Sequence, residues 1–150
     1  MRPLPSLAEV ETYLHQHIPL SAGMGVRVAA CDGTGVTLRA PLAPNINQNS
    51  TVFGGSASAV AILSAWTWLY FALLSAKQGP RLVIQRSNVD YLAPINGDFV
   101  AHCAGLPPAQ CEEFLRTLER YGKARATLAA VLTCEGEKVA AFTGDYVAAR

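Results

Sequence analysis

The sequence is short of charge. Charged residues make up 15% of the 150-residue chain, apolar residues make up 51%, and the formal net charge is +1. Lysine and arginine are scattered among the acidic residues and form no basic stripe, which excludes nucleic acid as a partner. So apolar a composition also excludes a disordered chain and predicts extensive burial, with room for a subunit interface.

Metal-binding and disulfide patterns are absent as well. The four cysteines, Cys31, Cys103, Cys111 and Cys134, include no CxxC pair, so neither a metal site nor a disulfide is expected. Residues 1–6 show no basic region leading into an apolar one, so a cytoplasmic location is expected. The chain has no GxSxG elbow, which argues against an α/β-hydrolase, and no cofactor is expected.

One long segment lacks charge altogether. No charged side chain occurs between Arg39 and Lys77, and residues 54–76 are long enough to span a bilayer. However, the segment opens with Gly-Gly-Ser and carries Trp66 and Trp68 in its middle, whereas tryptophans of membrane helices gather at the ends. We therefore expect a helix buried inside a soluble domain and no membrane span.

The remaining elements follow from hydrophobic periodicity and from turn signals. Ser6 and Glu9 form a capping box ahead of the first helix. Helices are predicted over residues 7–18, 55–76 and 108–121, and strands over residues 25–30, 35–40, 82–92, 99–105, 124–134 and 139–148. Six antiparallel strands and one helix that is apolar all round pack economically if the sheet curls around that helix. The prediction is a single α+β domain over residues 1–150.

The segment Asn45-Ile-Asn-Gln-Asn-Ser-Thr-Val-Phe-Gly-Gly-Ser56 is the most informative for chemistry. It leads an Asn-rich loop into Gly54 and Gly55 at the start of the buried helix. A helix N-terminus offers unpaired N–H groups and a partial positive charge, and glycine lets a substrate approach them. Such a site suits a thioester carbonyl that becomes an oxyanion. The alternative is a tight loop-to-helix junction with Ser56 as its cap.

Three segments carry a resemblance to a known family: Pro44-Asn45-Ile-Asn47, Thr51-Val-Phe-Gly-Gly-Ser56 running on to Trp66, and Val89-Asp-Tyr91-Leu-Ala-Pro94 with Gly97-Asp98. They resemble the hot-dog-fold thioesterases, specifically the small bacterial branch related to the C-terminal domain of YiiD. The resemblance covers nearly the whole chain in element order. It implies a hot-dog fold, in which a curved six-stranded sheet wraps a central helix. It also implies that two subunits pair with their sheets side by side and build each active site at the interface. The open edges of a curved sheet separately predict a homodimer or a dimer of dimers.

The resemblance also implies roles for individual residues. The Gly55 N–H would polarise the thioester carbonyl, and Asn47 would hold the attacking water or the substrate. Phe53 stands where many relatives have a histidine, and Ile62 stands where many carry the carboxylate that acts as nucleophile or base. The substrate-binding set expected on these grounds is Asn45, Phe53, Gly54, Ser56, Ile62 and Ser87.

Asp90 is the remaining candidate for a general base. It follows the helix in the next strand and could approach the site of a neighbouring subunit; the alternative is a solvated strand residue. The inward face of this strand is left open by its pattern, because Val83, Val89 and Tyr91 favour one parity and Leu82, Ile84 and Leu92 the other.

Three functions remain open. The first is hydrolysis of an acyl-CoA or acyl-carrier thioester, and the second is acyl-CoA or lipid binding without cleavage. The third, a hot-dog hydratase or dehydratase, ranks lowest because no His-and-carboxylate pair has a hydratase-like spacing. Four cations could contact the phosphates of CoA or be ordinary surface charges: Arg81, Arg86, Lys123 and Arg125.

Overall fold

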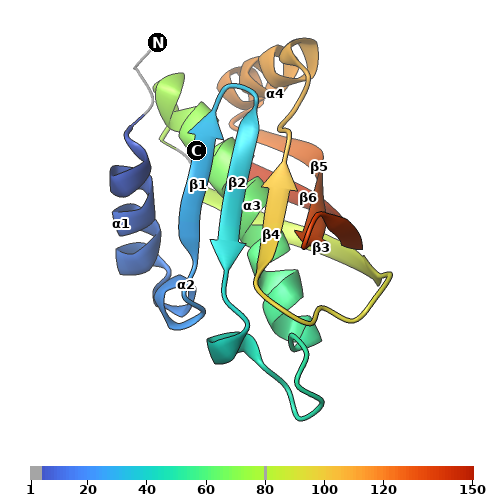
Figure 1. The fold of residues 1–150 in the computed structure, drawn as a ribbon. Helices are drawn as coiled ribbons and strands as arrows, with labels where there is room; N and C mark the ends of the chain where they lie inside the picture. The colour runs from blue at the N-terminus through green and yellow to red at the C-terminus, as the bar shows by residue number, and fades with distance from the viewer. Residues whose placement is uncertain (1–4, 80) are drawn as a thin grey trace.

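The computed structural model describes residues 5–79 and 81–150. Its elements follow in the order α1 (Leu7–His17), α2 (Pro19–Gly23), β1 (Arg27–Asp32), β2 (Gly35–Ala40), a 3-10 turn (Ala43–Asn45), α3 (Gly54–Ser75), β3 (Arg81–Tyr91), β4 (Phe99–Cys103), α4 (Pro108–Tyr121), β5 (Lys123–Cys134) and β6 (Glu137–Ala149). All three predicted helices and all six predicted strands are present. The first strand lies two residues later than predicted, and the short helix α2 is an addition (Figure 1).

Local signals explain where the outer helices begin and end. The Ser6 side chain accepts a hydrogen bond from the Glu9 N–H, and the Glu9 carboxylate accepts one from the Ser6 N–H, which confirms the predicted capping box of α1. Gly122 ends α4 in the left-handed conformation, with φ of 73°, a value that favours glycine. The helix α2 escaped prediction because five residues are too few to show a helical period.

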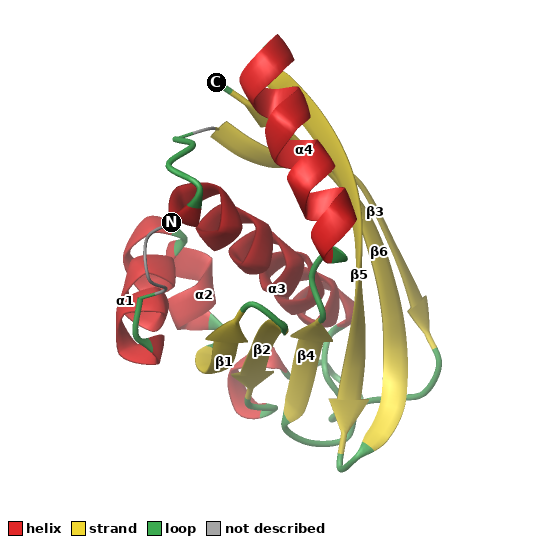
Figure 2. Cartoon of the chain, turned by 90° about the horizontal axis from the view of Figure 1, so that it is seen from above, coloured by secondary structure: helices red, strands yellow, loops and turns green. Residues whose placement is uncertain are grey.

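The six strands form one antiparallel sheet in the order β1-β2-β4-β5-β6-β3, so that β1 and β3 are its edges. In β5, buried residues alternate strictly with exposed ones from Lys123 to Val131. The buried set faces α3 and lines what we call the inner face of the sheet; the other side is the outer face. Figure 2 shows the sheet curving around α3, as the α+β hot-dog prediction requires.

The helix α3 owes its composition to this burial. It is the one helix of the described residues that is long and apolar enough to cross a membrane, and 61% of its most apolar window is buried inside the protein. Leu69 and Leu73 of α3 are fully buried, and so are Phe142 and Tyr146 on the inner face of β6. The core of the protein therefore lies between α3 and the inner face.

A β-bulge in β3 settles which way its side chains point. The pairing of β3 with β6 shifts register between Ile84 and Arg86, which leaves Gln85 without an opposite residue. Before the bulge, Ile84 lies opposite the buried Tyr146; after it, Val89 lies opposite the buried Phe142. Both parities in the sequence are therefore correct, each for its own half of the strand.

Candidate active site

The first turn of α3 begins at Gly54, one residue before the predicted start, and its cap residue Phe53 makes no side-chain hydrogen bond. The N–H groups of Ser56 and Ala57 donate to the Phe53 carbonyl at 2.9 and 3.1 Å. Within the described part of the chain, the N–H groups of Gly54 and Gly55 have no acceptor. Two free donors at the positive end of a 22-residue helix make a suitable place for a partial negative charge.

Two aromatic rings flank these glycines. The Tyr91 hydroxyl donates to the Gly54 carbonyl at 2.8 Å, which ties the end of β3 to the start of α3. The Phe53 ring lies against Gly55 so closely that a methyl group there would overlap it. Phe53 and Tyr91 are 58% and 53% exposed, so both rings border solvent. They form the walls of an open entrance to the helix N-terminus.

A cleft of about 380 Å³ opens beside the same turn. It is lined by Thr51, Val52, Ala57 and the segment from Tyr91 to Ile95. The loop before α3 and the end of β3 therefore enclose one space, although they lie some 40 residues apart in the chain. The predicted loop residues and the segment 89–94 are thus brought together.

Asn45, expected to bind substrate, is instead buried, with 2% of its surface exposed. Its amide nitrogen donates to the carbonyls of Met24 at 2.8 Å and Pro41 at 2.7 Å, and its own carbonyl accepts from the Phe53 N–H at 2.7 Å. The Asn45 side chain therefore joins the end of α2 to the end of β2, and its backbone carbonyl joins both to the start of α3. Its place in the structure is that of an anchor for the loop.

Asn47 lies within the loop, half-buried, and its amide group is engaged there. The amide oxygen accepts from the N–H groups of Asn49 at 2.9 Å and Thr51 at 3.1 Å. The amide nitrogen donates to the Thr51 hydroxyl at 2.9 Å. Asn47 thus shapes the loop beside the cleft. The predicted contact with water or substrate would require it to exchange one of these hydrogen bonds.

Ser87 and Asp90, the two candidate site residues on β3, point to opposite faces of the sheet. Ser87 lies opposite Gly144 and shares the inner face with Val89 and Tyr91. Asp90 lies opposite Ala141 and points to the outer face. Ser87 is therefore on the side of α3, whereas Asp90 is separated from Gly55 of the same chain by the sheet.

Ile62 belongs to a stripe along α3 that the sheet leaves partly uncovered. The stripe consists of Gly55, Ala59, Ile62, Trp66 and Tyr70, spaced three or four residues apart and so on one face of the helix. All of these side chains after Gly55 are half-buried. The stripe gives an apolar path that starts at the free N–H groups.

Hydrogen bonds hold this stripe in place. The buried Tyr146 hydroxyl donates to the Ile62 carbonyl at 2.6 Å, and burial raises the pKa of Tyr146, so that it stays protonated. The Trp66 indole N–H donates to the Leu82 carbonyl at 3.0 Å, which attaches the middle of α3 to β3. Ser56, the alternative cap, is half-buried and lies inside the first turn instead of capping it.

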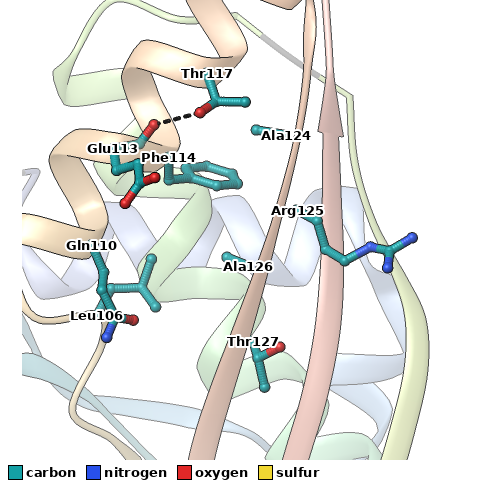
Figure 3. Close-up of a pocket in the computed structure, with 9 residues that line it drawn as sticks. All are labelled: Leu106, Gln110, Glu113, Phe114, Thr117, Ala124, Arg125, Ala126 and Thr127. Atoms are coloured by element: carbon teal, nitrogen blue, oxygen red, sulfur yellow. Dashed lines mark hydrogen bonds between the residues drawn. The ribbon is translucent and has the colours of Figure 1, made fainter.

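Metal-dependent chemistry and catalysis by a cysteine thiol have little support among the described residues. The described residues contain no group of three His, Cys, Asp or Glu side chains placed to hold a metal. Burial raises the pKa of the Cys103 thiol, which disfavours the nucleophilic thiolate. A second cleft, of about 320 Å³, lies between α4 and β5 and is lined by Glu113 and Thr117 among others (Figure 3).

Comparison with known proteins identifies the family and the fold. Residues 7–150 match the family model described as "Putative thioesterase (yiiD_Cterm)". The fold is similar to that of a putative thioesterase from Shewanella oneidensis, with 28% identity, 96% of this chain and 97% of that chain covered, and a TM-score of 0.86. It is also similar to a protein of unknown function from Chlorobaculum tepidum TLS (29% identity, 95% and 93% covered, TM-score 0.90).

A third structure shares the fold at lower identity. It is a probable thioesterase from Pseudomonas aeruginosa, 23% identical over 97% of both chains, with a TM-score of 0.83. The family match covers nearly the whole chain and includes the loop, the start of α3 and the end of β3. The chain therefore belongs to the YiiD C-terminal family of putative thioesterases and has their hot-dog fold.

Proposed function

We propose that this protein hydrolyses an acyl-CoA or acyl-carrier thioester in the cytoplasm, with the reacting carbonyl held at the first turn of α3. The observation that carries the proposal is the pair of free N–H groups at Gly54 and Gly55, which lie beside an open cleft at the positive end of a buried helix. In water-excluding surroundings such donors stabilise developing negative charge strongly.

The reaction follows from this placement. A water oxygen adds to the thioester carbonyl carbon, and the carbonyl electrons move to the oxygen, which the Gly55 N–H stabilises. When the tetrahedral intermediate collapses, the carbon–sulfur bond breaks and the thiolate leaves. One proton of the water goes to that thiolate and the other is released to solvent, so the products are a carboxylate, a thiol and a proton.

The acyl chain extends along the half-buried stripe of α3. A chain bound with its carbonyl at Gly55 passes Ala59 and Ile62 and reaches Trp66 after about 16 Å, at 1.5 Å of rise per residue. Ile62 therefore lines the acyl pocket in this proposal, and Phe53 and Tyr91 enclose the thioester. Ser87 borders the same side of the sheet.

A second candidate, acyl-thioester binding without cleavage, is favoured by one observation. The helix α3 contains no aspartate or glutamate, and Asp90 points to the outer face. Measuring thiol release from a panel of acyl-CoA and acyl-carrier thioesters separates the two. Release with turnover supports hydrolysis; tight binding without release supports the second candidate and contradicts the first.

We further propose that the protein is a homodimer joined through β3. This edge strand has eleven residues, and no other strand of the described residues pairs with its free side; long open edges attract a second strand. The apolar side chains of Val83, Tyr91 and Leu92 are 59%, 53% and 57% exposed on and beside it. A second copy of β3 would cover them and extend the sheet.

Charge indicates the register of this pairing. On the outer face, Arg86 and Asp90 stand on either side of Asn88. If two antiparallel β3 strands meet with Asn88 opposite the partner's Asn88, each Arg86 lies opposite the partner's Asp90. Both charge pairs are then satisfied at once. In this proposal, Asp90 serves the interface, because it points to the outer face and pairs there with the partner's Arg86.

Charge reversal tests this register. Arg86→Asp or Asp90→Arg alone should weaken the dimer on the order of tenfold, because each places two like-charged pairs across the strands. The double variant Arg86→Asp/Asp90→Arg should restore the dimer. Sedimentation velocity measures both, with Arg116→Asp on the exposed face of α4 as the matched control. Failure of the double variant to restore association would contradict this register.

A further inference from the structure

Four cations from strands β3 and β5 gather on the outer face. Arg81 lies in one row with Lys123, because both pair with Ala149 of β6. Arg125 lies in the next row, opposite Val147, and points away from α4 (Figure 3). Neighbouring strands are about 4.8 Å apart, so side chains on β3 and β5 are separated by only about 10 Å.

The β-bulge brings the fourth cation to the same face. Arg81 and Arg86 are five residues apart, a spacing that places side chains on opposite faces of a regular strand. The unpaired Gln85 shifts the alternation by one, so that Arg86 lies opposite Asp145 on the outer face. We call Arg81, Arg86, Lys123 and Arg125 the cationic patch.

The patch is poorly neutralised. All four side chains are exposed, and within the described residues none forms an ion pair. Asp145, which lies opposite Arg86, is the carboxylate on this part of the sheet. It accepts a hydrogen bond from the Thr127 hydroxyl at 2.7 Å. Four cations against one carboxylate, in a chain whose net charge is only +1, concentrate positive potential on this part of the sheet.

We propose that the cationic patch binds the phosphate groups of the CoA nucleotide, an assignment that rests on the proposed function. Guanidinium groups bind phosphate in a bidentate manner, and lysine adds a point charge. The phosphates of one CoA need several cations close together on an accessible surface. Arg81, Lys123 and Arg125 supply them even when Arg86 pairs across the dimer.

The patch serves the cleft of the partner subunit. In its own chain it lies roughly 25 Å along β3 from Tyr91, at 3.3 Å per residue, and on the opposite face of the sheet from Gly55. In the register centred on Asn88, the partner's Arg81 lies beyond Tyr91, the last residue of this chain's β3 and one of the residues that line its cleft. Each site is then completed by cations from the other subunit.

Calorimetric titration with CoA tests the assignment and does not depend on hydrolysis. The double variant Arg81→Gln/Arg125→Gln should bind CoA on the order of tenfold more weakly, and raised salt should weaken wild-type binding. Pantetheine, which lacks the phosphates, should bind the variant and the wild type alike. Arg116→Gln, an exposed arginine on α4, is the matched control and should change neither affinity.

Three outcomes would overturn the assignment: no CoA binding by the wild type, unchanged CoA binding by the double variant, or an equal loss for pantetheine. If an acyl-carrier protein loses affinity and CoA does not, the patch docks the carrier, and the CoA assignment is wrong. Absence of thiol release with CoA binding intact would contradict hydrolysis alone.

The dimer provides a separate test of the partner's role. Asp90→Arg keeps all four cations but should weaken the dimer, and at a concentration where the variant is monomeric and the wild type dimeric it should weaken CoA binding as the double variant does. Undiminished CoA affinity in the monomeric Asp90→Arg protein would show that the patch acts within one chain and would overturn the role of the partner.

Discussion

Replacing Gly55 with alanine should lower thioester turnover on the order of a hundredfold, the effect expected when an oxyanion loses its donor. A methyl group at this position overlaps the Phe53 ring and forces it off the glycine, toward the entrance of the cleft. The carbonyl oxygen then cannot reach the free N–H groups. Stability should change little, because alanine is the better helix former and the exposed ring can rotate.

Steady-state kinetics and thermal unfolding of the same samples measure the two effects. Gly23→Ala is the matched control, because a methyl group there meets nothing within 4 Å. The double variant Phe53→Ala/Gly55→Ala separates two causes of the loss: low activity identifies the methyl group as the obstacle, and restored activity identifies the displaced ring. Wild-type turnover by Gly55→Ala itself would place the reaction elsewhere in the protein.

Much of the fold could be predicted because its largest signals are local or compositional. The uncharged run between Arg39 and Lys77 predicts a buried helix whatever surrounds it. The capping box at Ser6 and the glycine after Tyr121 mark helix ends through hydrogen bonds within a few residues. Strands with clear alternation, such as β5, were placed within one or two residues.

The bulge of β3 could not be predicted, because it depends on a second strand. The sequence shows two conflicting parities, with Ile84 in one half and Val89 in the other, and either parity alone describes a complete strand. Only the register against β6 reveals that one parity holds before Gln85 and the other holds after it. The gathering of Arg81 and Arg86 on one face was hidden for the same reason.

The different roles of Asn45 and Asn47 were equally out of reach. Both stand in one Asn-rich loop, and an amide suits a ligand and a backbone carbonyl equally well. Which asparagine becomes an anchor depends on where the carbonyls of Met24 and Pro41 converge. Those carbonyls belong to the ends of α2 and β2, and α2 was not predicted at all.

Replacing Asn45 with alanine should be the most damaging single change at the site for stability. The side chain is 2% exposed and donates to two carbonyls, and buried polar groups left without a partner cost about 1–3 kcal/mol each. We expect a loss of about 2–4 kcal/mol in the free energy of unfolding. Turnover should fall as well, because without the two side-chain hydrogen bonds the Asn45 backbone carbonyl is no longer fixed where it accepts from the Phe53 N–H at the start of α3.

Aspartate at the same position distinguishes an anchor from a ligand-binding residue. Asn45→Asp keeps the shape of the side chain but removes the donor and buries a carboxylate against two carbonyls, so it should destabilise the protein more than alanine does. Urea unfolding measures both variants, and Asn49→Ala, an exposed asparagine of the same loop, is the matched control. If Asn45→Ala instead lost activity while unfolding at the wild-type urea concentration, Asn45 would act on the substrate, as the sequence first predicted.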